Sequence, residues 1–271
     1  MRGWIVYDAE GAKRNEWFSD RLRECAEALS ARAEIVPAER LTDFSGEMPD
    51  FAVVRTMNPS VNAALERAGV TVFNNSATAE IADDKYKTYV FASRLGIPTM
   101  PTCPADGFCK EVAYPVVVKS RDGHGGKEVF LIEDGEEFSA FAKSHDVARF
   151  IVQPSCTETG VDVRVYVLGG KVVAAVKRQS HVDFRSNYSL GGEISLFAPT
   201  EEQKTTAERI ATALGSDFIG VDFISDRGKW VLNEIEDPVG TRALYALTDF
   251  DAAKEFMTYV VTKTATRVKK A

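Results

Sequence analysis

The chain has 271 residues, of which 45% are hydrophobic and 27% charged, which is typical of a globular protein with a substantial core and two or three lobes. Its net charge of −7 argues against a nucleic-acid-binding surface, because such surfaces carry a basic stripe. No apolar run is long enough to span a membrane, and Asp8 comes too early for a signal peptide. The cysteines lack C-x-x-C spacing, so we expect a reducing compartment and a cytoplasmic location.

The first third of the chain alternates short apolar runs with helical patterns, which predicts a mostly parallel sheet with crossover helices. No G-x-G-x-x-G motif follows the first apolar run, so the dinucleotide-binding fingerprint is absent. Strands are expected at residues 4–7, 33–37, 51–54 and 70–73, and helices around residues 17–29 and 59–68.

Two further helices are expected between residue 76 and Leu95, where Gly96-Ile97-Pro98 ends them. From Tyr114 onward the chain is rich in β-formers. Strands are expected at 115–119, 129–132, 149–153, 163–168 and 171–177, followed by a helix over 200–214, a hairpin from 218 and a last helix from about residue 251.

A glycine-rich connection, Ser120-Arg-Asp-Gly123-His124-Gly125-Gly126-Lys127, joins the first two of these later strands. Its glycines let backbone N–H groups approach a ligand closely, and phosphate is the usual ligand. Lys119 ends the preceding strand, where its ammonium can reach a phosphate. Tight hairpins also use glycines, and strand lysines also reach for water, so a phosphate site and a plain hairpin both stay open. We expect His124 to face solvent or phosphate, because no partner lies at ligand spacing.

A second polar segment follows the strand at 171–177 and contains Arg178, Arg185 and Asn187 among turn residues. Guanidinium groups suit the negative charge of a phosphoryl group in transfer. The alternative is an ordinary surface loop. An acidic hairpin further along favours the phosphoryl interpretation, because Mg²⁺ needs acids to hold it and phosphates to complete its shell.

That hairpin is the most informative part of the chain, and its loop contains Asp226-Arg227-Gly228. The glycine suits the left-handed position of a three-residue loop. This loop would pair Ser225 with Lys229 and place Asp222 opposite Leu232.

Three acids, Asp222, Glu234 and Glu236, would then share one face of the hairpin. Carboxylates clustered on a buried sheet repel one another unless a cation lies between them. We therefore predict a Mg²⁺ site, with a solvated polar face as the alternative.

In chain order these segments resemble the ATP-grasp superfamily, and within it the RimK-like carboxylate–amine ligases. The similarity extends from about residue 50 onward, and the preceding residues are compatible with it. The motifs that carry it are Asp84-Lys85 with 93–99, the strand 114–119 with the glycine loop, 162–178, 183–192 and 220–238.

The resemblance implies an α/β and α+β chain of three lobes, in which two α+β lobes enclose ATP. The implied lobes are an N-terminal α/β lobe over 1–75, a small lobe with the glycine loop over 76–152, and a large lobe with the metal site over 153–271.

The resemblance also assigns site residues. Two Mg²⁺ ions, with Mn²⁺ as an alternative, would be held by Asp222, Glu234 and Glu236. Charge on the γ-phosphate and the acyl phosphate would be offset by Arg178, Arg185 and Asn187, the implied catalytic residues. ATP would be contacted by Lys85, Lys119, Gly123, Gly125, Gly126, the adenine-side hinge Gln153, Pro154 and Ser155, and the ribose-side Asp162. Two positions depart from the family: Pro154 replaces an acidic hinge residue, and Glu236 replaces an asparagine.

The implied reaction is ADP-forming amide synthesis, in which a carboxylate is phosphorylated and an amine, such as glutamate, displaces phosphate. The acceptor can be a peptide, a carrier or a small molecule. Alternatives are a dipeptide ligase of free amino acids, a non-catalytic ATP-binding sensor and a hydroxyl phosphotransferase. We expect no nucleic-acid or membrane partner and leave a homo-oligomer open. Arg55 is a candidate for binding a substrate carboxylate, with a structural salt bridge as the alternative.

Overall fold

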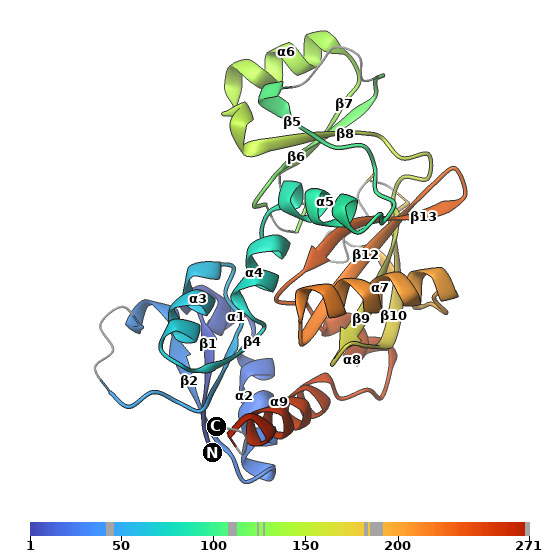
Figure 1. Ribbon diagram of the computed structural model, residues 1–271. Helices are drawn as coiled ribbons and strands as arrows, with labels where there is room; N and C mark the ends of the chain where they lie inside the picture. Colours follow the sequence, from blue (N-terminus) through green and yellow to red (C-terminus); the bar gives the residue numbers. More distant parts are fainter. Residues whose placement is uncertain are drawn as a thin grey trace.

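The computed structural model describes residues 1–41, 46–107, 113–123, 125–126, 128–181, 184 and 192–268. Three sheets organise these residues, and each sheet forms the centre of one lobe (Figure 1). Over the described part of the chain, no helix is both long and apolar enough to cross a lipid bilayer.

The first lobe contains the parallel sheet that the alternating pattern predicts. Its strand order is β2-β1-β3-β4, and every neighbouring pair is parallel. The two central strands are almost fully buried, because one apolar core lies on each face of the sheet. The elements are β1 (Arg2–Tyr7), α1 (Ala9–Arg14), α2 (Glu16–Ala28), β2 (Arg32–Pro37), β3 (Phe51–Val54), α3 (Pro59–Arg67) and β4 (Thr71–Phe73).

The last helix, α9 (Ala252–Val268), returns to the first lobe (Figure 1). Phe256 and Met257 of α9 share one apolar core with Phe18 and Leu22 of α2. The segment predicted as a separate lobe over 153–271 therefore contributes a helix to the core of the first lobe.

Helices α4 (Ser76–Ala82) and α5 (Lys85–Arg94) lie between the first lobe and the other two (Figure 1). Ala82 and Ala92 are buried in the apolar core of the third lobe. Asp84 caps α5 by accepting hydrogen bonds from two backbone amides of its first turn. Helix α5, whose first residue is Lys85, therefore packs on the third lobe.

The second lobe is an antiparallel sheet in the order β5-β8-β6-β7. Its helix α6 was not predicted, although Asp134 caps it and two glutamates occupy its first turn, which is a recognisable start signal. Phe141 of α6 packs edge-to-face on Phe150, with ring centroids 5.0 Å apart. The elements are β5 (Cys103–Pro104), β6 (Val116–Ser120), β7 (Val129–Ile132), α6 (Gly135–Ser144) and β8 (Phe150–Pro154).

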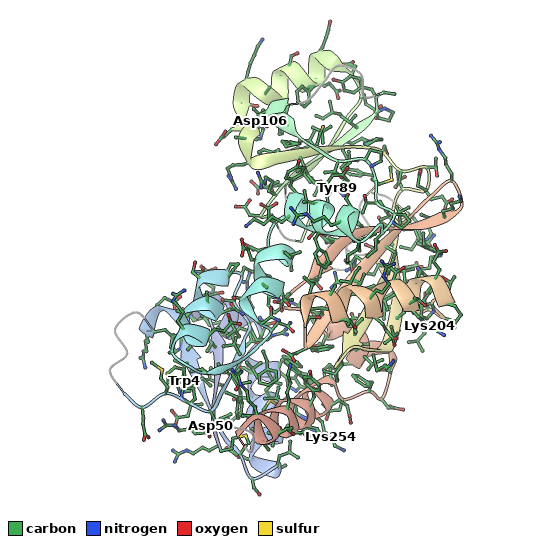
Figure 2. All side chains as sticks on the ribbon, in the orientation of Figure 1. Trp4, Asp50, Tyr89, Asp106, Lys204 and Lys254 are labelled. Atoms are coloured by element: carbon green, nitrogen blue, oxygen red, sulfur yellow. The ribbon has the colours of Figure 1, made fainter. Side chains whose placement is uncertain are left out.

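The third lobe is a five-stranded sheet in the order β11-β10-β9-β12-β13. Helix α7, marked by Lys204 in Figure 2, begins with a capping box between Thr200 and Gln203 and ends at the left-handed Gly215. Its buried side packs on the sheet. The elements are β9 (Val161–Leu168), β10 (Lys171–Gln179), β11 (Glu193–Leu196), α7 (Glu201–Leu214), β12 (Phe218–Asp226), β13 (Lys229–Glu236) and α8 (Arg242–Leu247).

The predicted register of the β12–β13 hairpin is wrong. Asp226 pairs with Lys229, which leaves a two-residue loop whose φ angles, 51° at Arg227 and 71° at Gly228, are both left-handed. Such a loop matches the twist of the strands better than the expected three-residue loop.

A β-bulge then shifts the pairing further along the hairpin, so that Asp222 lies opposite Glu234 instead of Leu232. The bulge leaves Asn233 unpaired in the ladder. Asp222 and Glu234 nevertheless share a face, as predicted, because directly opposed residues point to the same side of a sheet.

Candidate functional site

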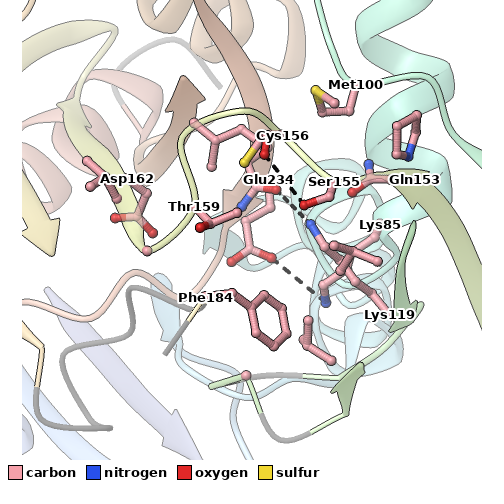
Figure 3. Close-up of a pocket in the computed structure, with 18 of the residues that line it drawn as sticks. Lys85, Met100, Lys119, Gln153, Ser155, Cys156, Thr159, Asp162, Phe184 and Glu234 are labelled. Carbon is pink, nitrogen blue, oxygen red and sulfur yellow. Dashed lines mark hydrogen bonds and ion pairs between the residues drawn. The ribbon is translucent and has the colours of Figure 1, made fainter. Parts of the chain in front are cut away.

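A pocket lies where α5, the second-lobe sheet and the β12–β13 hairpin meet (Figure 3). Its cavity volume is about 110 Å³. Every residue predicted to contact ATP lines this pocket, from Lys85 on α5 to Asp162 on β9, and so do Arg178 and Glu234. Sequence reasoning therefore brought together residues that the fold also brings together.

Lys85 links two sides of the pocket. Its ammonium donates a hydrogen bond to the carbonyl of Gly123 and lies 3.8 Å from the carboxylate of Glu234. The neighbouring Asp84 accepts hydrogen bonds from Arg121 at 2.6 to 3.2 Å, which ties the start of α5 to the end of β6. Lys85 is thus held in position for an anion between the glycine loop and the acidic strand.

Lys119 enters the pocket from β6, and its ammonium donates a 2.9 Å hydrogen bond to the side chain of Asn233. Burial lowers the pKa of Lys119 to about 8, although the nearby Glu234 carboxylate opposes this shift. A bound anion would stabilise the charged form of this poorly solvated lysine. The two lysines therefore give the pocket a cationic wall made from separate lobes.

The glycine loop covers the pocket from the second lobe. A side chain at Gly123 would collide with the hydroxyl of Ser120, because the backbone of Gly123 lies close to that side chain. Gly125 and Gly126 have φ angles of 68° and 74°, which only glycine adopts without strain. The described part of the loop thus requires glycine for conformational reasons, while His124 lies outside the described residues.

The predicted hinge lies at the end of β8, but its polar groups are partly engaged elsewhere. The Gln153 side chain donates to Thr102 at 2.8 Å, and the Ser155 amide donates to the Pro115 carbonyl at 3.0 Å. Pro154 has no N–H to offer. The remaining surroundings are apolar, and the wall includes Met100, Val117, Val129 and Ile224.

Arg178 and Asp162 form a buried bidentate ion pair, with N–O distances of 2.6 and 2.7 Å. Arg178 also donates to Asp222 at 2.6 Å, and Arg164 binds the same carboxylate through two 2.7 Å hydrogen bonds. Burial opposes the charge on Asp222, but the two guanidinium groups lower its pKa to about 2. Arg164 also pairs with Glu236. The result is a charge network in which Asp222 is the shared anion.

This network bears on the predicted metal site. Asp222 is 0% exposed and saturated by two arginines, whereas the side chains of Glu234 and Glu236 are 31% and 28% exposed. Within the described ranges, no three His, Cys, Asp or Glu side chains are arranged to hold a metal ion. The three acids thus do not form a preformed metal site, because arginines already neutralise Asp222 and Glu236. Their role as ligands stays a prediction.

A second pocket, with a cavity volume of about 260 Å³, adjoins the first. The two share Lys85, Gly125, Arg178 and Glu234. The second pocket continues along β13 toward the start of α8, where its wall includes Glu236, Asp237, Gly240 and Arg242. A ligand in either pocket can therefore contact the same cations and the same glutamate.

Asp237 is a titratable group of this wall with a strongly shifted pKa. It accepts a 2.8 Å hydrogen bond from Asn74 of the first lobe. Burial raises the pKa of Asp237 to about 7, although this hydrogen bond opposes the shift. At neutral pH the carboxyl is thus only partly ionised.

Two predicted catalytic residues, Arg185 and Asn187, lie outside the described residues. Arg55 lines neither pocket; it donates to the Val239 carbonyl at 2.8 Å and lies over the Phe18 ring. Sequence reasoning missed Arg164, the central cation of the network. The signal was its place beside Asp162 in the run Val-Asp-Val-Arg-Val, because alternate residues of a strand share a face.

Comparisons with known proteins identify the family of the chain. A family model described as the RimK-like ATP-grasp domain matches residues 84–260. The chain is 28% identical to the uncharacterized protein MG011 of Mycoplasma genitalium over 98% of its own length and 94% of that protein. It is 29% identical to a probable alpha-L-glutamate ligase of Maridesulfovibrio salexigens, over 82% of the chain and 78% of the relative. It is 34% identical to human N-acetylaspartylglutamate synthase A, over 75% of the chain and 57% of that protein.

Solved structures show the same fold. A RimK domain ATP-grasp protein from Sphaerobacter thermophilus aligns with a TM-score of 0.75 over 96% of this chain and 100% of that chain, at 22% identity. The D-alanine–D-alanine ligase of Bacillus anthracis in complex with ATP aligns with a TM-score of 0.76 over 100% and 99%, at 14% identity. The chain therefore belongs to the RimK-like ATP-grasp family, whose ligases form carbon–nitrogen bonds and release ADP.

Proposed function

We propose that this protein is an ATP-dependent carboxylate–amine ligase that forms an amide bond through an acyl phosphate. The observation that supports this activity best is the continuity of the two pockets through Lys85, Arg178 and Glu234. ATP in the first pocket would direct its γ-phosphate toward the shared wall. The carboxylate to be activated would approach the same wall from the second pocket.

The reaction has two transfers. A carboxylate oxygen attacks the γ-phosphorus, the bond to the β-phosphate oxygen breaks, and ADP leaves with that electron pair. The amine nitrogen then attacks the acyl carbon, inorganic phosphate leaves, and the nitrogen loses a proton. Lys85, Lys119 and Arg178 stabilise the negative charge that is in transit, and the surrounding lobes limit access of water to the acyl phosphate.

ATP-grasp ligases generally use ATP with Mg²⁺, and the donor chemistry here suits that ion. Glu234 and Glu236 are the partly exposed carboxylates on the second-pocket wall, so we propose them as its ligands. Bound Mg²⁺ would offset phosphate charge. Asp222 could join them only if Arg164 or Arg178 released it, so it is the third proposed ligand and the most costly to recruit. Whether one or two ions bind, and whether Mn²⁺ can replace Mg²⁺, belongs to the same proposal.

The names of two relatives, a glutamate ligase and an N-acetylaspartylglutamate synthase, favour glutamate as the amine. The partner carboxylate would belong to a peptide, a carrier or a small acid. We also propose a reducing, cytoplasmic setting, which the free thiols of Cys25 and Cys156 support.

The test is to incubate the full chain with ATP, Mg²⁺ and pairs of carboxylates and amino acids, and to measure ADP, phosphate and product mass. We expect ADP and phosphate in equal amounts with an amide product, and product that depends on both substrates. AMP and pyrophosphate would exclude the acyl-phosphate route. Products from free amino-acid pairs alone would indicate a dipeptide ligase, and a phosphorylated alcohol would indicate a phosphotransferase. Nucleotide binding without turnover would indicate a non-catalytic ATP-binding sensor. Glu234→Gln and Glu236→Gln should each raise the Mg²⁺ concentration needed for half-maximal rate.

A further inference from the structure

Arg242 differs from the other cations on the wall of the second pocket. It lies at the start of α8, its side chain is exposed, and it forms no ion pair or hydrogen bond with any described residue.

The other cations of this wall are already neutralised. Arg164 pairs with Asp222 and Glu236, and Arg178 pairs with Asp162 and Asp222. The ammonium of Lys85 lies close to Glu234. Each of these three cations thus has an acidic partner, and the acids outnumber them by one.

The acids nearest to Arg242 in sequence are also accounted for. Glu236 is held by Arg164, and Asp237 accepts a hydrogen bond from Asn74. Among the cations that line this pocket, Arg242 is therefore the one that has no partner among the described residues.

The position of Arg242 separates it from the reacting groups. It lines the second pocket but not the nucleotide pocket, whereas Lys85, Gly125, Arg178 and Glu234 line both. A substrate whose reacting group lies at the shared wall would extend away from ATP toward α8. Whatever Arg242 contacts is thus a part of the substrate that does not react.

We infer that Arg242 binds a non-reacting carboxylate of the amino-acid substrate and so selects acidic substrates. This inference rests on the proposed ligase function. Arginine suits the role because its planar fork pairs with both oxygens of a carboxylate, and such charge-assisted pairs are roughly twice as strong as neutral hydrogen bonds. The carboxylate is that of an acidic side chain, because all amino acids carry an α-carboxylate and contact with that group would not select acidic ones.

The test is a binding cycle between the protein and the ligand. Calorimetry with the full chain, Mg²⁺ and a non-hydrolysable ATP analogue would measure the affinity for three ligands. They are L-glutamate, L-glutamine and L-isoglutamine. L-Glutamine lacks the side-chain carboxylate, and L-isoglutamine lacks the α-carboxylate. For wild type against Arg242→Gln, we expect L-glutamate affinity to fall roughly 10- to 100-fold, the range typical of a lost charge-assisted hydrogen bond. For the amide that lacks the paired carboxylate, the same substitution should change affinity less than about 2-fold.

Two control variants make the outcome decisive. Arg242→Lys should restore part of the L-glutamate affinity, because it keeps the charge without the fork. Arg94→Gln, which removes an exposed arginine of α5 that lines neither pocket, should change nothing. Equal losses for all three ligands, no loss for any, or a wild type that prefers neutral amino acids would each overturn the inference. A wild type that shows the coupling but makes no product would overturn the ligase proposal instead.

Discussion

Lys119→Met tests whether the buried charge of Lys119 destabilises the fold and at the same time contributes to phosphate binding. The pKa of Lys119 falls from 10.5 to about 8 in the folded chain, which corresponds to about 3 kcal/mol of disfavoured charge. Methionine keeps a similar length without the charge, and it loses the hydrogen bond to Asn233, worth about 1 kcal/mol. We therefore expect the variant to be more stable than wild type by about 2 kcal/mol at pH 7.

The pH dependence has a definite sign. Because the folded pKa lies below the unfolded one, the cost is fully present below pH 8 and disappears as the pH rises toward 10.5. Urea denaturation should show the advantage of Lys119→Met shrinking over that window. Calorimetry at pH 7 should show the affinity for an ATP analogue falling by roughly 10- to 100-fold, since an ionic phosphate contact is lost.

The matched control is Lys143→Met, which replaces an exposed lysine on α6 of the same lobe. It should change neither stability nor affinity. A Lys119→Met protein that is less stable than wild type at pH 7, or that binds the analogue equally well, would refute the reasoning about this charge.

Three further outcomes are expected. Asp222→Asn should lower the free energy of unfolding in urea by about 3 kcal/mol or more, because it leaves two buried guanidinium groups without their shared anion. Glu236→Gln changes a partly exposed side chain and should lower the free energy of unfolding clearly less. Equal losses for the two variants would contradict the charge network. In the wild type, stability should fall between pH 3.8 and about 7, because the raised pKa of Asp237 means that the folded state favours the protonated acid and loses this advantage as the pH rises. Asp237→Asn should abolish this fall, which melting temperatures across the range would measure. An unchanged slope of melting temperature against pH would refute the prediction. Gly123→Ala should weaken nucleotide binding in calorimetry with little change in melting temperature. Adding Ser120→Ala should restore most of the affinity, because the serine hydroxyl is the atom with which the new methyl group would collide. If the affinity does not recover, this collision is not the cause of the weaker binding.

Periodicity was a good guide to the elements, and the residues that family resemblance assigned to ATP all line one pocket. Apolar alternation and helical spacing report which face of an element is buried, and motif residues such as Lys119 sit at strand ends, where a one-residue error matters little. Helix α6 was missed because its apolar pattern is short and its start signal, Asp134, was not used.

The acidic hairpin shows where sequence reasoning ends. A type of loop in which both central residues are left-handed, and a bulge at Asn233, each shift the register by one residue without changing composition. The pairing of Asp222 with Arg164 joins residues 58 positions apart. No local pattern specifies such a partner, and the presence of that partner decides whether the carboxylate is free to bind a metal.

The return of α9 to the first lobe constrains how the chain can fold during synthesis. The sheet of β1 to β4 leaves the ribosome early, but Phe256 and Met257 belong to the same core as Phe18. That core stays open until more than half of the chain has followed, so nascent first lobes expose apolar surface for many seconds at ordinary translation rates. Dependence on holdase chaperones, and sensitivity of expression to substitutions in α9, are the expected cellular consequences.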